Sequence, residues 1–167
     1  MMHASDKILT REQLHDALIE RRQNGERIVF TNGCFDLLHV GHARYLEVAR
    51  NFGDLLVVGI NSDLSVRGLK GEKRPLIPQD ERAELLAHLG CVDYVTIFDE
   101  ERPNVLIQTV QPSVHVKGGD YNPATLPEAE TVRQYGGRIE IVPLVEGRST
   151  TNVIARIREL YCDDSSV

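Results

Sequence analysis

The chain has 167 residues, a net charge of −6 at pH 7, a hydrophobic fraction of 41% and a charged fraction of 26%. These values are typical of one globular domain with enough length for a real core, so we expect a single domain over residues 1–162 and a disordered polar tail over 163–167. The negative charge argues against a general nucleic-acid binder or a binder of anionic membranes, whereas a local cluster of Lys and Arg would still suit a small phosphorylated substrate.

Cysteine usage and the apolar runs bear on the cellular compartment. The three cysteines are widely spaced and form no CxxC pair, which favours a reducing cytoplasm over a disulfide framework. The N-terminus lacks the apolar core of a secretory signal, and no apolar run approaches the roughly 20 residues needed to span a bilayer. We therefore expect a cytoplasmic protein.

The first half of the chain predicts helices alternating with strands. Residues 10–24 read as a helix, because Thr10 and Gln13 fit a capping box and Gly25 suits the position just past its end. Strand one is expected over 27–31 and the next helix up to residue 52. The continuous apolar run over 55–60 indicates a strand that is buried on both faces.

The second half continues the alternation after a basic loop at 67–75. It predicts helices over 78–90, 103–112 and 127–135, and strands over 94–98, 113–117 and 138–143, with a last helix capped by Ser149 or Thr150. The expected fold class is α/β, a doubly wound five-stranded parallel sheet of Rossmann-like type. Ligands of such sheets bind beyond the carboxyl ends of the strands, near the switch point.

The turn after strand one carries the strongest chemical signal. A strand, a glycine-containing turn and a helix start over residues 28–50 form an arrangement that can cradle phosphate. His39 and His42 stand three residues apart, so they share one face of the first helical turn. Two such imidazoles could donate to phosphate oxygens or could bind a metal, although no third and fourth ligand of suitable spacing accompanies them.

Three motifs together resemble one enzyme family. The segment 33–42, GCFDLLHVGH, resembles the HxGH signature of the nucleotidyltransferases that include cytidylyltransferases and phosphopantetheine adenylyltransferase. The segments 116–121, VKGGDY, and 146–151, EGRSTT, are similar to the adenylyltransferase domain that makes ADP-heptose from D-glycero-β-D-manno-heptose 1-phosphate. The resemblance runs from about Leu9 to Leu160. That domain is often fused behind a sugar kinase, and this chain would be its stand-alone form.

One departure helps to place the chain within the family. The glycerol-phosphate cytidylyltransferase branch carries an additional arginine at the start of the last loop and an isoleucine before its Ser-Thr pair. This chain lacks that leading arginine and has Arg148 at the isoleucine position. The difference favours the heptose branch.

The resemblance implies a role for each matching residue. His39, His42 and Lys70 would be catalytic, by holding the triphosphate and stabilising charge at its α-phosphorus. Asp36, Asn61 and Asp63 would meet the sugar substrate. The implied nucleotide-binding residues are Cys34, Phe35, His39, His42, Arg82, Lys117, Gly118, Gly119, Asp120, Ser149, Thr150 and Thr151.

The implied reaction transfers AMP from ATP to the heptose 1-phosphate and releases pyrophosphate. The expected partners are therefore ATP with Mg²⁺ and a sugar 1-phosphate, with no nucleic acid and no membrane, and the metal ligands stay open. The family leans toward homodimers, and the helix at 10–24 is one candidate surface. Two alternatives remain: a cytidylyltransferase for a small alcohol phosphate or phosphonate, and a nucleotide-binding regulatory module without catalysis. The intact set of His39, His42, Lys70 and Lys117 argues against the second.

Overall fold

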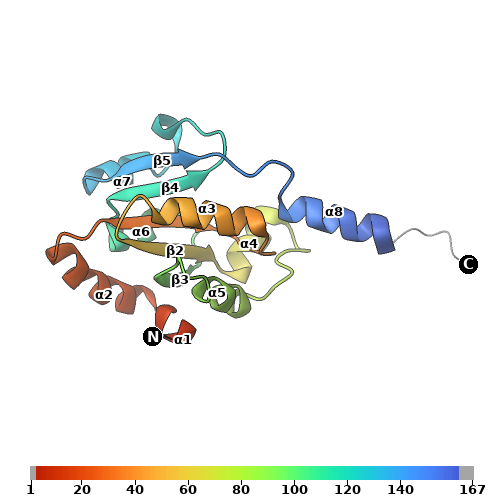
Figure 1. The fold of residues 1–167 in the computed structure, drawn as a ribbon, viewed down its shortest axis with the longest axis horizontal. Coiled ribbons are helices and arrows are strands. Elements are labelled where there is room, and N and C mark those ends of the chain that lie inside the picture. Colours follow the sequence, from red (N-terminus) through yellow and green to blue (C-terminus); the bar gives the residue numbers. More distant parts are fainter. Residues whose placement is uncertain (1–2, 162–167) are drawn as a thin grey trace, which may run out of the picture.

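A computed structural model describes residues 3–161, so the tail predicted over 163–167 lies outside the described part. Its centre is a five-stranded parallel sheet in the order β3-β2-β1-β4-β5 (Figure 1). The strands are β1 Ile28–Gly33, β2 Leu55–Asn61, β3 Tyr94–Phe98, β4 Val114–Gly118 and β5 Arg138–Val142. The predicted α/β fold with a five-stranded parallel sheet is confirmed.

Helices cover both faces of this sheet and bury two separate hydrophobic clusters. Those with buried side chains on one face are α3 Val40–Arg50 and α5 Gln79–Ala87, which contribute Leu46 and Leu86 to the first cluster. On the other face are α2 Arg11–Gln23, α6 Asn104–Val110 and α7 Ala129–Gln134, whose side chains share the second cluster with Phe30. The remaining helical elements are α1 Ala4–Lys7, α4 Asp63–Lys70, the 3₁₀ turn η1 Pro123–Thr125 and α8 Thr150–Tyr161.

Local signals in the sequence located several helix ends. The capping box of α2 forms as predicted, because Thr10 Oγ1 accepts from the Gln13 backbone N–H at 3.2 Å and the Gln13 side chain accepts from the Thr10 N–H at 2.9 Å. At α8, Ser149 Oγ accepts from the Asn152 N–H at 3.1 Å, so Ser149 is the residue that caps this helix. The predicted cap of α2 is therefore confirmed, and of the two caps that the sequence offered for α8 the structure uses Ser149.

The prediction of a basic loop over 67–75 was wrong for its first part. Residues 67–70 belong to α4, which starts where Ser62 Oγ accepts from the Ser65 N–H at 3.3 Å. The side chain of Val66 is fully buried and anchors this helix against the sheet. Lys70 consequently stands on the last turn of a helix rather than in a loop.

Strand β1 is the point at which the strand order reverses, because later strands are added first on one side of it and then on the other. It pairs with β2 on one side and with β4 on the other. The chain adds β2 and β3 on the first side, then crosses over and adds β4 and β5 on the second. The crevice outside the carboxyl ends of β1 and β4 is therefore the expected ligand site of this topology.

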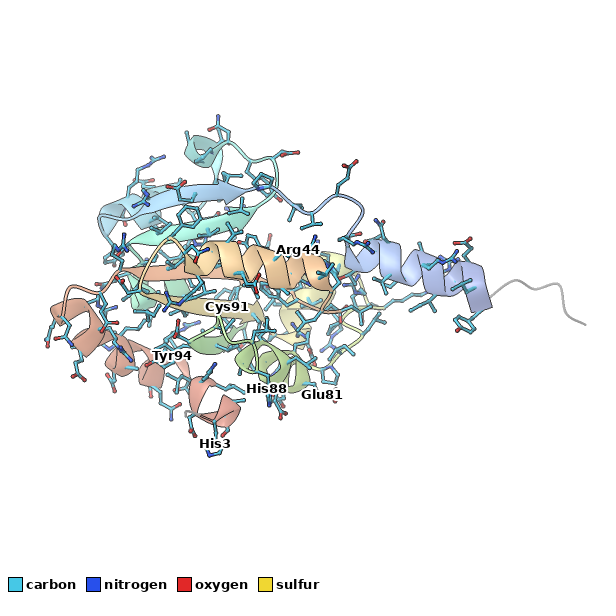
Figure 2. The ribbon with its side chains drawn as sticks, in the orientation of Figure 1. His3, Arg44, Glu81, His88, Cys91 and Tyr94 are labelled. Atoms are coloured by element: carbon cyan, nitrogen blue, oxygen red, sulfur yellow. The ribbon has the colours of Figure 1, made fainter. Side chains whose placement is uncertain are left out.

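Helix α8 stands away from the rest of the domain. It extends past the body in Figure 1, and Figure 2 shows its side chains projecting from it where no strand lies beside them. None of its residues is buried, and Val153, Ile157 and Leu160 are exposed. Within residues 3–161, no helix is both long and apolar enough to cross a membrane.

Candidate active site

The turn between β1 and α3 is held in a strained backbone conformation. Phe35 has φ of 47°, a left-handed value that bulky side chains rarely adopt. Its ring is buried and lies 5.2 Å from the ring of His42, at an angle of 57°. Strain of this kind persists where the surrounding structure enforces it, and here the ring packs beside a candidate site residue.

His39 and His42 form a stacked pair at the start of α3. Their ring centroids are 3.9 Å apart with 19° between the planes. His39 is the N-cap residue, yet its side chain makes no capping hydrogen bond. The Nδ1 atoms of both rings are buried without a hydrogen-bond partner among the described residues. Buried polar atoms are almost always satisfied, so an unpaired pair at a helix N-terminus is what a ligand-binding site would leave open.

The electrostatic setting keeps these rings neutral near pH 7. Burial, together with the neighbouring His39 ring, lowers the pKa of His42 to about 4. Burial and the positive charge of Arg148 lower the pKa of His39 as well. Two neutral imidazoles can each donate one hydrogen bond and accept another, so they can bind a ligand without first losing a proton.

Two hollows flank the histidine pair. The smaller has a volume of about 240 Å³ and the wider about 600 Å³, and both include residues 32–35 and His42. The smaller is also lined by His39, Gly41, Tyr45, Gly118, Leu144, Val145, Arg148, Ser149 and Thr150. The wider is also lined by Asp36, Leu69, Lys70, Arg74, Lys117, Gly118, Tyr121, Thr150 and Thr151. The predicted turn thus forms the wall between two adjoining spaces.

The charge of the wider hollow is opposite in sign to that of the whole chain. Lys70, Arg74 and Lys117 line it, while the protein carries a net charge of −6. Arg148 lines the smaller hollow on the other side of the histidines. This local excess of positive charge is what a polyphosphate ligand requires.

Asp36 fixes the loop that closes one side of the wider hollow. Its buried carboxylate accepts from the backbone N–H groups of Leu76 and Ile77 at 2.7 and 2.9 Å and pairs with Arg74. These three contacts hold the chain after α4 against the turn. The predicted contact of Asp36 with the substrate would have to use the hydrogen-bond acceptor sites of the carboxylate that these three contacts leave free.

Arg82 lies behind the turn rather than in either hollow. It is fully buried and donates to the carbonyls of Ile77 at 2.9 Å and Cys34 at 2.5 Å, and to Asp63 Oδ1 at 2.8 Å. Asn61, also buried, donates to Ser65 Oγ at 3.0 Å. Arg82, Asn61 and Asp63 therefore support the backbone around the site without lining either hollow, whereas the sequence predicted that they contact substrates.

The end of β4 brings two of its four predicted residues to the hollows. Lys117 and Gly118 line the wider one. A Cβ atom on Gly118 would lie 2.8 Å from Leu144 Cδ2, so a larger residue here would have to displace the exposed Leu144 side chain of the last loop. Gly119 and Asp120 follow and line neither hollow, and Asp120 is exposed.

The last loop contributes hydroxyl groups at the N-terminus of α8. Ser149 and Thr150 line the smaller hollow, and Thr150 and Thr151 line the wider one. Thr150 Oγ1 also donates to the Leu37 carbonyl at 3.5 Å, which ties this helix start to the β1–α3 turn. All three residues lie where the sequence predicted them.

Several residues of the site were missed by the sequence reasoning. Tyr45 lines the smaller hollow, where its hydroxyl donates to the Val116 carbonyl at 2.9 Å and contacts Thr31 Oγ1 at 2.6 Å. Its position three residues after His42 was an available signal, since it shares that face of α3. Asn32 and Tyr121 line the wider hollow, and both lie inside segments that the sequence analysis identified, although neither was assigned a role.

Comparison with known proteins gives one family and a set of long relatives. The model of a family described as cytidylyltransferase-like matches residues 30–158. The chain is 57% identical over 155 residues to bifunctional protein HldE of Syntrophotalea carbinolica, and 59% identical over 152 residues to that of Geotalea uraniireducens. These matches cover 93% and 91% of this chain but 32% and 31% of the relatives, so the chain spans about a third of their length.

Solved structures agree with this relationship at the level of the fold. A lipopolysaccharide core biosynthesis protein from Thermoplasma volcanium has a TM-score of 0.59 and 29% identity, over 72% of this chain and 98% of its own. Pantoate-beta-alanine ligase from Francisella tularensis has a TM-score of 0.55 at 14% identity, over 96% of this chain and 81% of its own, and supports the fold alone.

Proposed function

The chain belongs to the cytidylyltransferase-like family of nucleotidyltransferases, and from this premise we propose that it transfers AMP from ATP to D-glycero-β-D-manno-heptose 1-phosphate. The products are ADP-heptose and pyrophosphate. The observation that carries the proposal is the stacked pair His39 and His42, which stands between a hollow lined by Arg148 and a wider one lined by Lys70, Arg74 and Lys117.

The choice of substrates rests on motifs and relatives. The segments 116–121 and 146–151 resemble the domain that makes ADP-heptose, and both reach the hollows beside the histidines. The relatives are named bifunctional, and this chain spans about a third of them. A chain of that length is expected to carry one of two activities, and the family membership selects nucleotidyl transfer.

The proposed chemistry needs no general base. A phosphate monoester has its second pKa near 6, so the sugar 1-phosphate is largely dianionic at pH 7. One of its oxygens attacks the α-phosphorus of ATP, a new P–O bond forms, and the bond to the β-phosphate bridging oxygen breaks. The electron pair leaves with pyrophosphate. Catalysis then depends on positioning and on donors aimed at the charge that develops around phosphorus.

The residues around the hollows match those requirements. We assign His39 and His42 to the α- and β-phosphates, as hydrogen-bond donors at the N-terminus of α3. Lys70 and Lys117 are assigned to the reacting phosphates as well, since both line the wider hollow. Ser149 and Thr150 add donors from the start of α8.

Magnesium is assigned to the substrate rather than to a resident site. Among residues 3–161 no three His, Cys, Asp or Glu side chains are placed to hold a metal ion together. The two candidate carboxylates, Asp36 and Asp63, are already bonded to arginines. The ion would enter as Mg·ATP, since Mg²⁺ usually keeps several waters and binds through substrate phosphates.

A pyrophosphate-release assay tests the proposal. The protein is incubated with Mg²⁺, either ATP or CTP, and a panel of sugar 1-phosphates and alcohol phosphates. We expect release with ATP and the heptose 1-phosphate. Release with CTP alone would replace this assignment by a cytidylyltransferase, and no release with any pair would remove both enzymatic assignments.

A further inference from the structure

Glu128 is a buried carboxylate that the proposed reaction does not use. It directly precedes α7 at the N-cap position, yet its side chain makes no capping hydrogen bond. Only 4% of the residue is exposed. A glutamate is rarely buried unless a partner compensates it, so its contacts should explain why it lies there.

Those contacts join Glu128 to two residues of β4. Its Oε1 atom lies 3.0 Å from Lys117 Nζ and 3.4 Å from His115 Nε2. His115 is fully buried and stacks on Phe30 of β1, with ring centroids 5.2 Å apart. His115 and Lys117 are two residues apart in one strand, so both point to the face of the sheet where α7 packs.

The charges in this cluster form a consistent set. Burial alone would raise the pKa of Glu128, but the hydrogen bond from His115 and the charge of Lys117 lower it to about 2. Burial lowers the pKa of His115, so the ring is neutral near pH 7 and donates from Nε2. The cluster is therefore an ion pair of Glu128 with Lys117, and the neutral His115 ring donates a hydrogen bond to the same carboxylate.

The same ammonium group reaches the candidate active site. Lys117 Nζ donates to Asn32 Oδ1 at 3.3 Å, and both Asn32 and Lys117 line the wider hollow. An ammonium has three donors. Glu128 and Asn32 take two of them from the protein side, which leaves one for a ligand in the hollow.

We propose that Glu128 is a positioning residue that fixes the ammonium of Lys117 at the floor of the wider hollow, with His115 fixing the carboxylate in turn. Without the carboxylate, the flexible four-carbon stem of Lys117 would be free to move among many rotamers. Displacing a phosphate-binding group by about 1 Å can cost on the order of 100-fold in rate. The role of Lys117 toward phosphate rests on the proposed function.

A double-mutant cycle tests whether Glu128 acts through Lys117. We would measure kcat and KM for Mg·ATP and for the sugar phosphate in the wild type, Glu128→Gln, Lys117→Met and the double variant. Glu128→Gln keeps size and shape but removes the charge. We expect it to lower kcat/KM at least about tenfold, and to cause little further loss in the Lys117→Met background, because residues that act as a unit are not additive.

Two further variants separate positioning from folding. Glu130→Gln removes the same charge from an exposed position of α7 and should leave kcat/KM within about twofold of the wild type. Glu128→Asp keeps the charge but draws the carboxylate back by one methylene, so we expect partial activity, and it replaces Glu128→Gln in the cycle if that variant does not fold. Melting temperatures are recorded for all variants.

The outcomes separate this inference from the proposed function. The positioning role would be overturned if the loss of kcat/KM in the double variant equals the product of the two single losses. An unchanged kcat/KM in Glu128→Gln would also overturn it. A wild type without turnover would instead overturn the proposed function. In that case the dissociation constant for Mg·ATP, measured by calorimetry in the same four proteins, replaces kcat/KM in the cycle. A weaker affinity in Glu128→Gln that disappears in the Lys117→Met background supports positioning, and equal affinities refute it.

Discussion

A Cβ atom on Gly41 would lie 2.9 Å from both Cε1 and Nδ1 of His39 and 3.2 Å from the Cβ of Arg148. Contacts below 3.0 Å are not tolerated, so any other residue here must displace the histidine ring. The absence of a side chain at Gly41 is therefore what allows His39 to fold back over the first turn of α3 and stack on His42. The spacing of the His-x-Gly-His motif follows from this packing.

Gly41→Ala should break the stacked pair while leaving the sheet intact. We expect turnover to fall by about 10- to 100-fold, because the displaced His39 no longer meets the phosphate at its productive position. Pyrophosphate release measures the effect. Gly90→Ala is the matched control, since nothing lies within 4 Å of its added Cβ, and a similar loss there would contradict the packing argument.

His42→Ala should reduce kcat by about 10²–10³-fold, the usual cost of losing one preorganised donor to a transition state. The fold should persist, because His42 is only partly buried and belongs to neither core cluster, although its ring lies beside Phe35 of the first cluster. Circular dichroism and pyrophosphate release are measured on one sample. Near-normal turnover would remove the phosphate-binding role of this residue.

Stability should fall as the pH drops from 7 to 4. The pKa of His42 is about 4 in the folded protein and about 6.5 when unfolded, so the unfolded state binds more protons in this window. The stability that depends on neutral His42 is complete above pH 6.5 and is lost toward pH 4, by on the order of 2 kcal/mol after allowing for solvent screening. The free energy of unfolding, measured by urea titration at several pH values, should depend less steeply on pH in His42→Gln than in the wild type. An equal pH dependence in the two proteins would refute the role of His42.

Arg82→Met should destabilise the protein severely. The change leaves the Ile77 and Cys34 carbonyls without their donor and Asp63 without its partner. Breaking a buried charged network in this way costs about 3–5 kcal/mol. Arg102→Met, at an exposed position, should change the unfolding free energy by less than about 0.5 kcal/mol. A stable Arg82→Met protein with a raised KM for ATP would favour the nucleotide contact predicted from the sequence.

Tyr45→Phe should cost stability more than activity. The change removes the hydrogen bonds that the Tyr45 hydroxyl makes with the buried Val116 carbonyl and the Thr31 hydroxyl, at a cost of about 1–3 kcal/mol. The ring that lines the smaller hollow is kept, so turnover should stay within a few fold. Tyr135→Phe, where the side chain is exposed, serves as the control in thermal unfolding. A loss of turnover without a loss of stability would assign the hydroxyl to the ligand.

The sequence predicted the fold well because each element carried a local signal. The alternation of apolar runs with capped helices was enough for the parallel sheet, and Thr10 and Ser149 marked helix starts that the structure contains. The basic stretch 67–75 misled the prediction, since its charges concealed the helix that Ser62 caps and Val66 anchors. A short helix with a charged outer face is easily read as a loop when its buried residues, here Ser65 and Val66, are not recognised.

The candidate site was predictable where its residues follow strands and not where they reach it through long-range contacts. His39, His42, Lys117 and Thr150 lie at the hollows because post-strand loops meet at one edge of the sheet. Arg82 matched a family position, but its buried hydrogen bonds to backbone carbonyls depend on packing that no motif encodes. The role of Glu128 could not be predicted for the same reason, because its partners lie on a different element, β4.

The central place of β1 in the sheet also orders the events of folding. The turn at 33–42 appears early in the chain, but its basic wall requires Lys117, whose contact with Asn32 joins residues 85 positions apart. Closing so long a loop is entropically costly, and pairing of this kind forms slowly. A nascent chain that ends before β4 can contain the whole His-x-Gly-His motif and still lack Lys117, Arg148 and the hydroxyl groups at the start of α8.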